Sequence, residues 1–298
     1  MVSFTNEDHE HPSKIVERYL SIFKADPNLG QNFLIDPSPI QKSIQASCDL
    51  GLNNDSHVLE IGPGPGVLSI ELLRLGSKVT ALEISQDACD FLESEFNHEE
   101  FNLLNEDALR TKWPHDITHI VANIPYGISS PILERIQDHH QTNPLSGVSL
   151  LVQREFAHRM AMKSIPKDRG PLGIALWLDF ECEIISDVPS SSFRPQPDVA
   201  SSIVTLRPIS RTELQDVSRK LVRGISSWCF GRRRRKIRTS LRGLPRRLLK
   251  IGKWSSADWL QILDNLEKVG GDLQGFMDKR PEELRPEQWT SICRLISR

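Results

Sequence analysis

The chain has 298 residues, of which 38% are hydrophobic and 26% charged, enough for one large core or two. No apolar run approaches the roughly 18 residues of a membrane span. The first eight residues lack the basic and then apolar layout of a secretory signal. The five cysteines are scattered and form no Cys-x-x-Cys pair, which argues against disulfides or a zinc site. The net charge is −2, yet residues 207–253 hold 16 Lys and Arg against two acids, a balance of +14 that leaves −16 elsewhere. We therefore expect a cytoplasmic protein with no membrane partner and no metal, whose basic segment contacts a polyanion.

Strands that alternate with helices are predicted along the first two thirds of the chain. Helical spacing occurs over 13–24, 68–75 and 85–96. Short apolar runs predict seven strands, at residues 57–61, 78–84, 102–104, 117–122, 147–152, 178–186 and 202–206. This alternation implies βαβ units and a mostly parallel sheet.

The pattern changes at Pro208. Beyond it the strand signals disappear, and apolar residues recur at helical spacing over 214–228 and 259–266. We expect an α/β domain over 1–208, with an N-terminal helical extension, and a helical, Arg-rich domain over 209–298.

Glycines end the strand at 57–61, in the run Gly62-Pro63-Gly64-Pro65-Gly66. Glycine at a strand-to-helix turn lets a ligand approach the backbone, although such a turn can also serve no ligand. A nicotinamide site usually has the spacing Gly-x-Gly-x-x-Gly, which differs. Glu83 ends the next strand, where an acid accepts hydrogen bonds from ribose hydroxyls, though alone it could be a solvated strand end. Together these features favour a nucleoside-containing cofactor.

Two further polar groups follow strands at the same expected edge. Asp107 could accept a hydrogen bond from an adenine amine, or be an ordinary loop acid. Asn123-Ile124-Pro125-Tyr126 follows the strand at 117–122, and Pro125 favours an extended Ile124. The Asn123 side-chain oxygen and the Ile124 carbonyl could then accept both hydrogens of an exocyclic amine while Tyr126 stacks on its base. A simple exit from the strand is the alternative.

In this order the motifs resemble the KsgA-type ribosomal RNA adenine dimethyltransferases, which use S-adenosylmethionine to modify small-subunit rRNA. The matching motifs span residues 29–206, and the resemblance extends to the C-terminal region. The matching motifs are Leu29–Leu34, Val58–Gly64, Ala81–Ile84, Glu106–Leu109, Asn123–Tyr126, Gln153–Arg159 and Phe193–Pro197. It implies a Rossmann-like methyltransferase sheet with a smaller C-terminal helical domain, and direct methyl transfer to N6 of adenine.

The resemblance also implies site residues. Those expected to bind S-adenosyl-L-methionine are Gln31, Asn32, Leu34, Gly62, Gly64, Glu83, Ile84, Asp107, Ala108 and Asn123. Asn123, Ile124, Pro125 and Tyr126 form the catalytic loop, with Phe193 facing Tyr126 across a flipped adenine. The segment 167–173 departs from the family pattern, and residues 128–131 are closer to the archaeal and eukaryotic branch.

The densest basic run is Phe230–Arg238. A solvated face or a nuclear-localisation-like signal are two interpretations, and a phosphate-contacting surface is the one we favour. The residues expected to bind RNA are Arg232, Arg233, Arg234, Arg235, Lys236 and Arg238. The expected partner is small-subunit rRNA or the pre-ribosomal small subunit, bound by a monomer.

Three alternatives share these motifs. The related enzymes that methylate large-subunit rRNA and confer macrolide resistance differ only in substrate. A ribosome-assembly or RNA-binding factor could use the same fold without needing catalysis. DNA adenine methyltransferases share the catalytic loop.

Overall fold

The computed structural model describes residues 10–297, except for the side chain of residue 213. The chain forms two compact units, Met1–Ala157 with Glu181–Pro208 and His158–Phe180 with Ile209–Arg298. Unit 1 therefore ends at Pro208, but the expectation that all of 1–208 forms one domain is wrong for 158–180. This segment belongs to unit 2 because Ile174 and Leu178 are fully buried in the unit 2 core.

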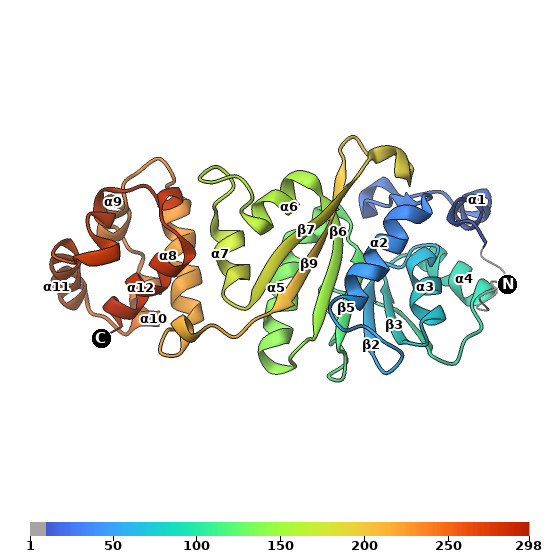
Figure 1. The fold of residues 1–298 in the computed structure, drawn as a ribbon, viewed down its shortest axis with the longest axis horizontal. Helices are drawn as coiled ribbons and strands as arrows, with labels where there is room; N and C mark the ends of the chain where they lie inside the picture. Colours follow the sequence, from blue (N-terminus) through green and yellow to red (C-terminus); the bar gives the residue numbers. More distant parts are fainter. Residues whose placement is uncertain (1–9, 298) are drawn as a thin grey trace. The chain divides into compact units, whose positions relative to one another are not determined.

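A seven-stranded sheet in the order β4-β3-β2-β5-β6-β9-β7 forms the centre of unit 1 (Figure 1). The strands are β2 His57–Ile61, β3 Lys78–Glu83, β4 Phe101–Asn105, β5 His119–Asn123, β6 Gly147–Gln153, β7 Phe180–Val188 and β9 Ser201–Pro208. The pairs among β4, β3, β2, β5 and β6 are parallel, and β9 runs antiparallel to β6. All seven predicted strands are present, within a few residues of the expected bounds.

Helices cover both faces of this sheet, which is why its central strands are continuous apolar runs. The helices are α2 Pro37–Cys48, α3 Val67–Arg74, α4 Gln86–Glu95 and α5 Ser129–Thr142. From β2 the chain moves outward in opposite directions, through β3 and β4 and then through β5 and β6. Because such crossovers are right-handed, α3 and α4 lie on one face and α5 on the other (Figure 1).

The N-terminal segment is fastened to unit 1 by aromatic contacts and a short strand pair. Helix α1 (Pro12–Ile22) buries Tyr19, whose ring makes edge contacts with Phe33 and Phe91 at centroid distances of 5.2 and 5.3 Å. The two-residue strand β1 (Phe33–Leu34) pairs antiparallel with β8 (Phe193–Arg194). These contacts hold the loop before β1 in place, where it contributes to the site described below.

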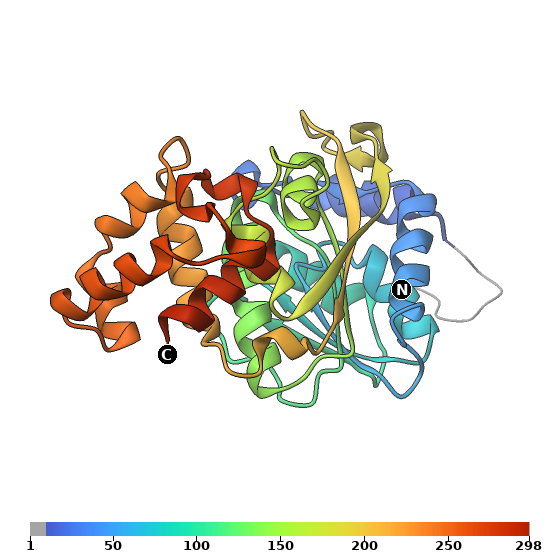
Figure 2. The ribbon, with the colours of Figure 1, turned by 60° about the vertical axis from the view of Figure 1, so that its left-hand side comes forward.

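Unit 2 is a cluster of short helices, drawn in yellow-green, orange and red in Figure 2. Its helices are α6 Arg154–Ala161, which begins in unit 1, α7 Pro171–Trp177, α8 Arg219–Phe230, α9 Ile237–Arg242, α10 Arg246–Gly252, α11 Ser256–Glu267 and α12 Pro286–Ile296. They pack around fully buried side chains such as Trp289 and Ile225. One-turn 3-10 helices occur at Pro27–Leu29, Tyr126–Ile128, Ser190–Ser192, Thr212–Leu214, Gly271–Leu273, Phe276–Asp278 and Pro281–Glu283.

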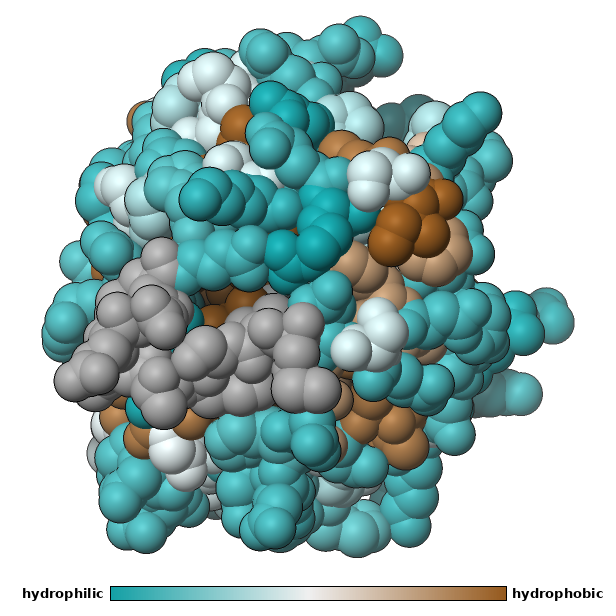
Figure 3. Space-filling model, turned by 90° about the vertical axis from the view of Figure 1, so that its right-hand side faces the viewer, coloured by the Kyte–Doolittle hydropathy of each residue, from teal (hydrophilic) through white to brown (hydrophobic). Residues whose placement is uncertain are grey.

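The surface is mixed in polarity. Figure 3 shows a largely hydrophilic face, interrupted by apolar side chains that gather on one side of the view. Within residues 10–297, no helix has both the length and the apolar character that crossing a bilayer requires.

A buried acid lies in β2, one residue before the end of the strand. Glu60 is 1% exposed, and the Ser69 hydroxyl of α3 donates a hydrogen bond of 2.6 Å to its Oε2. Burial raises the pKa of this carboxyl to about 8, with the Ser69 bond acting in the opposite direction and the charge of Glu83 adding to the rise. The folded protein therefore retains a proton on Glu60 at pH values where the unfolded chain releases it.

This retention predicts that stability falls as pH rises between the unfolded and folded pKa values of Glu60, from about 4.5 to about 8. The neutral Glu60→Gln variant should lack that dependence. Between pH 6 and 8 the free energy of unfolding of the variant, relative to the parent, should rise by about 2 kcal/mol, since each pKa unit corresponds to about 1.4 kcal/mol. Chemical denaturation at both pH values checks this, with exposed Glu99→Gln as control. Parallel pH profiles for Glu60→Gln and the parent would contradict it.

Candidate functional site

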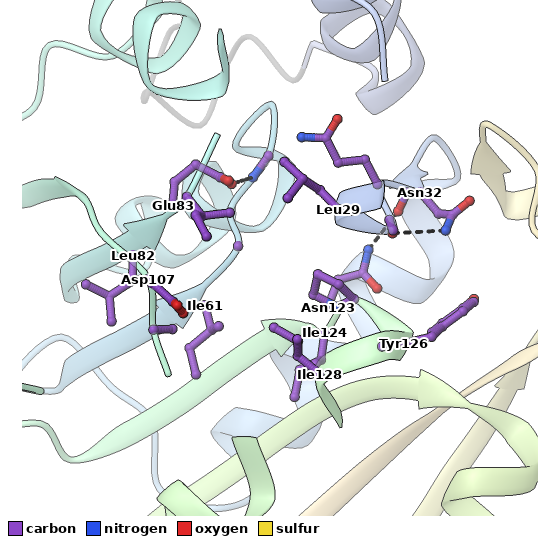
Figure 4. Close-up of a pocket in the computed structure, with 18 of the residues that line it drawn as sticks. Leu29, Asn32, Ile61, Leu82, Glu83, Asp107, Asn123, Ile124, Tyr126 and Ile128 are labelled. Atoms are coloured by element: carbon purple, nitrogen blue, oxygen red, sulfur yellow. Dashed lines mark hydrogen bonds between the residues drawn. The ribbon is translucent and has the colours of Figure 1, made fainter. Parts of the chain in front are cut away.

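A pocket of ≈ 320 Å³ lies at the carboxyl ends of four neighbouring parallel strands (Figure 4). Across the sheet from β4 to β5, the strand ends present Asp107, Glu83, the glycine turn and Asn123 in that order. The predicted residues that line the pocket are Gln31, Asn32, Gly62, Gly64, Glu83, Ile84, Asp107, Ala108, Asn123, Ile124, Pro125 and Tyr126. The fold thus brings together segments from five separate parts of the chain.

Two predicted site residues do not line the pocket. Leu34 and Phe193 lie opposite each other in the β1–β8 pair, 1% and 3% exposed, and both belong to the core of unit 1. Side chains alternate along a strand, so when Phe33 lines the pocket its neighbour Leu34 points elsewhere. The Leu34 side chain thus belongs to the core and not to the pocket lining, and a cofactor contact of this residue stays a prediction. Phe193 is likewise outside the pocket lining, and its place opposite Tyr126 across a flipped adenine stays a prediction.

The glycine turn is shaped by its neighbours as well as by its own backbone. Gly64 has φ of +55°, and a Cβ on it would lie 2.9 Å from Cε1 of Phe33. Its N–H donates a hydrogen bond of 3.0 Å to Oε2 of Glu83, whose Oε1 accepts from the Ser85 N–H at 2.9 Å. Burial raises the pKa of the Glu83 carboxyl, and these backbone donors oppose the rise. The carboxylate is thereby held between the ends of β2 and β3.

At the β4 end of the pocket, Asp107 is partly engaged by its own loop. Its Oδ1 accepts a hydrogen bond of 2.8 Å from the Leu109 N–H, and its Oδ2 lies 3.3 Å from Nε of Arg110. Arg110 is 87% exposed, so this ion pair is screened by solvent. Ala108 and the 53% exposed Ile84 provide apolar surface beside the carboxylate.

At the β5 end, the Asn123 amide has a fixed orientation. Its Nδ2 donates a hydrogen bond of 3.0 Å to the Asn32 carbonyl, which directs Oδ1 away from that contact (Figure 4). The Ile124 N–H donates to the Leu151 carbonyl of β6 at 3.1 Å. The Tyr126 hydroxyl lies 2.8 Å from Oγ of fully buried Ser201 on β9 and so positions its ring at the pocket wall.

Several lining residues were not predicted from the sequence. Phe33 shapes the glycine turn, and Ile61, Leu82 and Ile128 add apolar wall. Ile61 directly precedes the predicted Gly62, and Leu82 directly precedes the predicted Glu83, so the expected strand ends could have identified both. Phe33 gave no such signal, because its role depends on contact with Gly64, 31 positions away.

Comparison with known proteins agrees with this geometry. The family model described as ribosomal RNA adenine dimethylase matches residues 22–261. The chain belongs to this family. A ribosomal RNA small subunit methyltransferase A from Lactobacillus johnsonii is 30% identical over 300 residues, which cover 95% of this chain and 93% of the relative. A relative from Methanopyrus kandleri, named a probable ribosomal RNA small subunit methyltransferase A, is 31% identical over 269 residues, covering 90% and 91%.

Solved structures give the same picture. A dimethyladenosine transferase from Plasmodium falciparum has a TM-score of 0.66 and 25% identity, covering 87% of this chain and 95% of that one. The 23S rRNA methyltransferase ErmE has a TM-score of 0.61 and 26% identity, covering 90% and 100%. The predicted family and methyltransferase fold are confirmed. Bacterial and archaeal relatives have similar identities, so they do not test the predicted branch.

The basic segment of this rRNA adenine dimethylase family member is partly engaged within unit 2. Lys236 and Arg238 both pair with Asp278, at 3.0 and 2.7 Å. Arg233 donates to the carbonyls of residues 166 and 167, and its Nε lies 3.6 Å from Glu282. These three cations therefore have structural partners.

The other three predicted RNA-binding residues differ from one another. The Arg232 guanidinium lies over the ring of Trp228, 3.4 Å from its centroid. Arg234 and Arg235 are exposed, and neither has an ion pair with any side chain in the described part of unit 2. Of the six predicted residues, these two have the fewest contacts to lose on meeting a phosphate.

The glycine turn yields a stability prediction. Gly64→Ala should lower the free energy of unfolding by about 1–2 kcal/mol, because an L-residue at positive φ is strained and the new Cβ would meet the Phe33 ring. Gly127→Ala is the matched control, because Gly127 also lines the pocket, its φ is not positive and its Cβ would meet nothing within 4 Å. Urea denaturation of both variants checks this, and equal losses would show that the contact with Phe33 is not restrictive.

Proposed function

We propose that the protein is an S-adenosylmethionine-dependent rRNA adenine N6,N6-dimethyltransferase that acts on small-subunit rRNA. The observation that carries the proposal is the order of groups along one sheet edge: Asp107, Glu83, the glycine turn, then Asn123. That order suits an elongated ligand made of a base, a ribose and an amino-acid tail, with its reactive centre beside Asn123. Family membership and the names of its relatives agree.

The residues present fit S-adenosylmethionine. Asp107 would accept from the adenine amine, and Ile84 and Ala108 would contact the faces of the base. Glu83, held by the N–H groups of Gly64 and Ser85, retains lone pairs for the ribose hydroxyls. When bound, the cofactor supplies an electrophilic methyl group on a cationic sulfur.

At the other end, Asn123 would act on the target base. The N6 lone pair of adenine is delocalised into the ring, which makes the amine a poor nucleophile. Because Nδ2 of Asn123 is committed to Asn32, Oδ1 is available to accept one amine hydrogen, and the Ile124 carbonyl would accept the other. This localises the lone pair and orients it, so the acceleration comes from positioning and electrostatics.

The target adenine has to leave its stack to reach this site, at a cost of a few kcal/mol. Tyr126 offers a ring fixed through its hydroxyl bond to Ser201, and stacking on it would offset part of that cost. The Tyr126 ring is therefore already in position before RNA binds.

The test is to incubate the protein with labelled S-adenosylmethionine and under-methylated small subunits, and to locate the label by mass spectrometry of rRNA fragments. We expect dimethyladenosine in small-subunit rRNA and none in matched large-subunit rRNA or DNA. Asn123→Ala should lower the turnover at least about 100-fold, the loss typical of removing one preorganised polar contact. Its affinity for S-adenosylhomocysteine should remain within a few-fold of the parent.

Each contrary outcome has a distinct meaning. Label in large-subunit rRNA would favour the macrolide-resistance activity, and label in DNA the DNA adenine methyltransferases. Full activity of Asn123→Ala would refute the role of its amide. No transfer to any of these substrates, despite cofactor binding, would favour a ribosome-assembly factor.

We further propose that Arg234 and Arg235 contribute most to phosphate binding within the predicted run. Each is exposed and has no ion pair with a described side chain, whereas Lys236 and Arg238 share the carboxylate of Asp278. The proposed partner is rRNA, free or within the pre-ribosomal small subunit.

A pair of double variants tests this assignment. Arg234→Gln with Arg235→Gln should weaken binding to small-subunit rRNA and reduce the slope of log affinity against log salt by about 1.4–1.8, since each phosphate contact contributes about 0.7–0.9. Lys236→Gln with Arg238→Gln removes the same formal charge and should change the slope by less than half as much. Fluorescence anisotropy from about 50 to 200 mM salt measures both, and equal slopes would contradict the assignment.

A further inference from the structure

The loop after β4, which carries Asp107, is held in place by two side chains outside the lining of the pocket. The Trp113 indole N–H donates a hydrogen bond of 3.0 Å to the Ala108 carbonyl. The Arg135 guanidinium donates to the carbonyls of Leu109 and Thr111, the latter at 2.7 Å. Three carbonyls within four residues of Asp107 thus have side-chain donors, and neither Trp113 nor Arg135 is part of the pocket wall.

Arg135 and Trp113 also contact each other. The guanidinium carbon of Arg135 lies 4.9 Å from the centroid of the Trp113 ring, and Trp113 is only 4% exposed. Arginine can bond two carbonyls with its planar fork while stacking on an aromatic face, a combination that lysine does not offer. Hydrogen bonds from a charged donor are also stronger than neutral ones. The Arg135–Trp113 pair therefore holds three carbonyls of the loop, and its two members also support each other.

The helix that carries Arg135 has a second connection to the site. Helix α5 begins at Ser129, directly after the pocket-lining segment that starts at Asn123. At 1.5 Å per residue, Arg135 lies about 9 Å along α5 from Ser129. Helix α5 is therefore connected to both ends of the pocket, to the Asn123 segment through the chain and to the loop that carries Asp107 through Arg135.

We propose that Arg135 and Trp113 are positioning residues that fix Asp107 for the exocyclic amine of the cofactor's adenine. The inference rests on the proposed function, in which Asp107 accepts from that amine. If the two residues only stabilised the fold, the same contacts would be present, but substituting either residue would lower the affinity for every ligand of the pocket by the same factor. The two roles therefore differ in one measurable property, the discrimination between ligands with and without the amine.

The test compares two ligands by calorimetry, S-adenosylhomocysteine and its analogue in which purine without the 6-amino group replaces adenine. The variants are Arg135→Lys, which keeps the charge, and Trp113→Phe, which removes only the N–H donor and part of the ring. Lys112→Gln is the matched control, because it removes an exposed charge from the same segment without removing a loop contact. Asp107→Asn tests the acceptor itself, and thermal unfolding confirms that each variant is folded.

We expect the parent and Lys112→Gln to prefer the amine-bearing ligand by about 10-fold or more, the range of a hydrogen bond to a charged acceptor. Arg135→Lys and Trp113→Phe should reduce that preference to within about 3-fold, while binding of the purine analogue changes little. In turnover assays, KM for S-adenosylmethionine should rise and kcat should stay within a few-fold, because Asn123 is held separately by Asn32.

The outcomes separate the inference from the proposed function. If the parent shows no preference, or Asp107→Asn retains it, the proposed contact between Asp107 and adenine is wrong. If the parent and Asp107→Asn behave as expected but both positioning variants keep the full preference, or lose affinity for both ligands equally, the positioning role is overturned.

Discussion

Parallel pairing of β4, β3, β2 and β5 is the constraint on which the pocket depends. In parallel strands the carboxyl ends meet at one edge, spaced by about 4.8 Å per strand, so consecutive strands deliver their terminal residues in a row. Asp107, Glu83 and Asn123 come from three different strands and acquire a fixed order only through this pairing. The lining therefore extends from the end of β4 to the end of β5, and the two ends of this row carry chemically different side chains.

Each end of that row needs an additional restraint, because strand pairing fixes backbone and not loops. At the β5 end, Asn32 supplies it by accepting from the Asn123 amide, a bond between residues 91 positions apart. At the β4 end, Trp113 and Arg135 supply it by bonding the loop carbonyls. In the middle, the Gly64 N–H bonds the Glu83 carboxylate directly. Except for Trp113, which is five positions from Ala108, these groups are 19 to 91 positions away in sequence from the groups they bond.

That separation explains how much could be predicted from the sequence. The strands could be predicted because burial on both faces makes them continuous apolar runs, and the polar residues after them follow from the topology. Helix α2 was missed because prolines occupy its first turn, where they are tolerated but resemble a turn signal. The side on which Leu34 and Phe193 lie depends on the register of a two-residue pair, and the assignment of 158–180 to unit 2 depends on packing.

The basic segment gives a second example, because its net charge counted along the sequence does not show which of its cations form ion pairs after folding. Residues 207–253 contain only two acids, yet in the folded protein acids from outside that range form ion pairs with its cations. Asp179 pairs with Arg219 and Arg223, Asp278 with Lys236 and Arg238, and Glu267 with Arg242. A cation that already has a carboxylate partner gains less from a phosphate than one that is hydrated, because the existing pair has to be broken first. In the proposed function, the arginines that remain unpaired after folding, and not the balance of +14 in the sequence, determine how strongly this segment binds RNA phosphates.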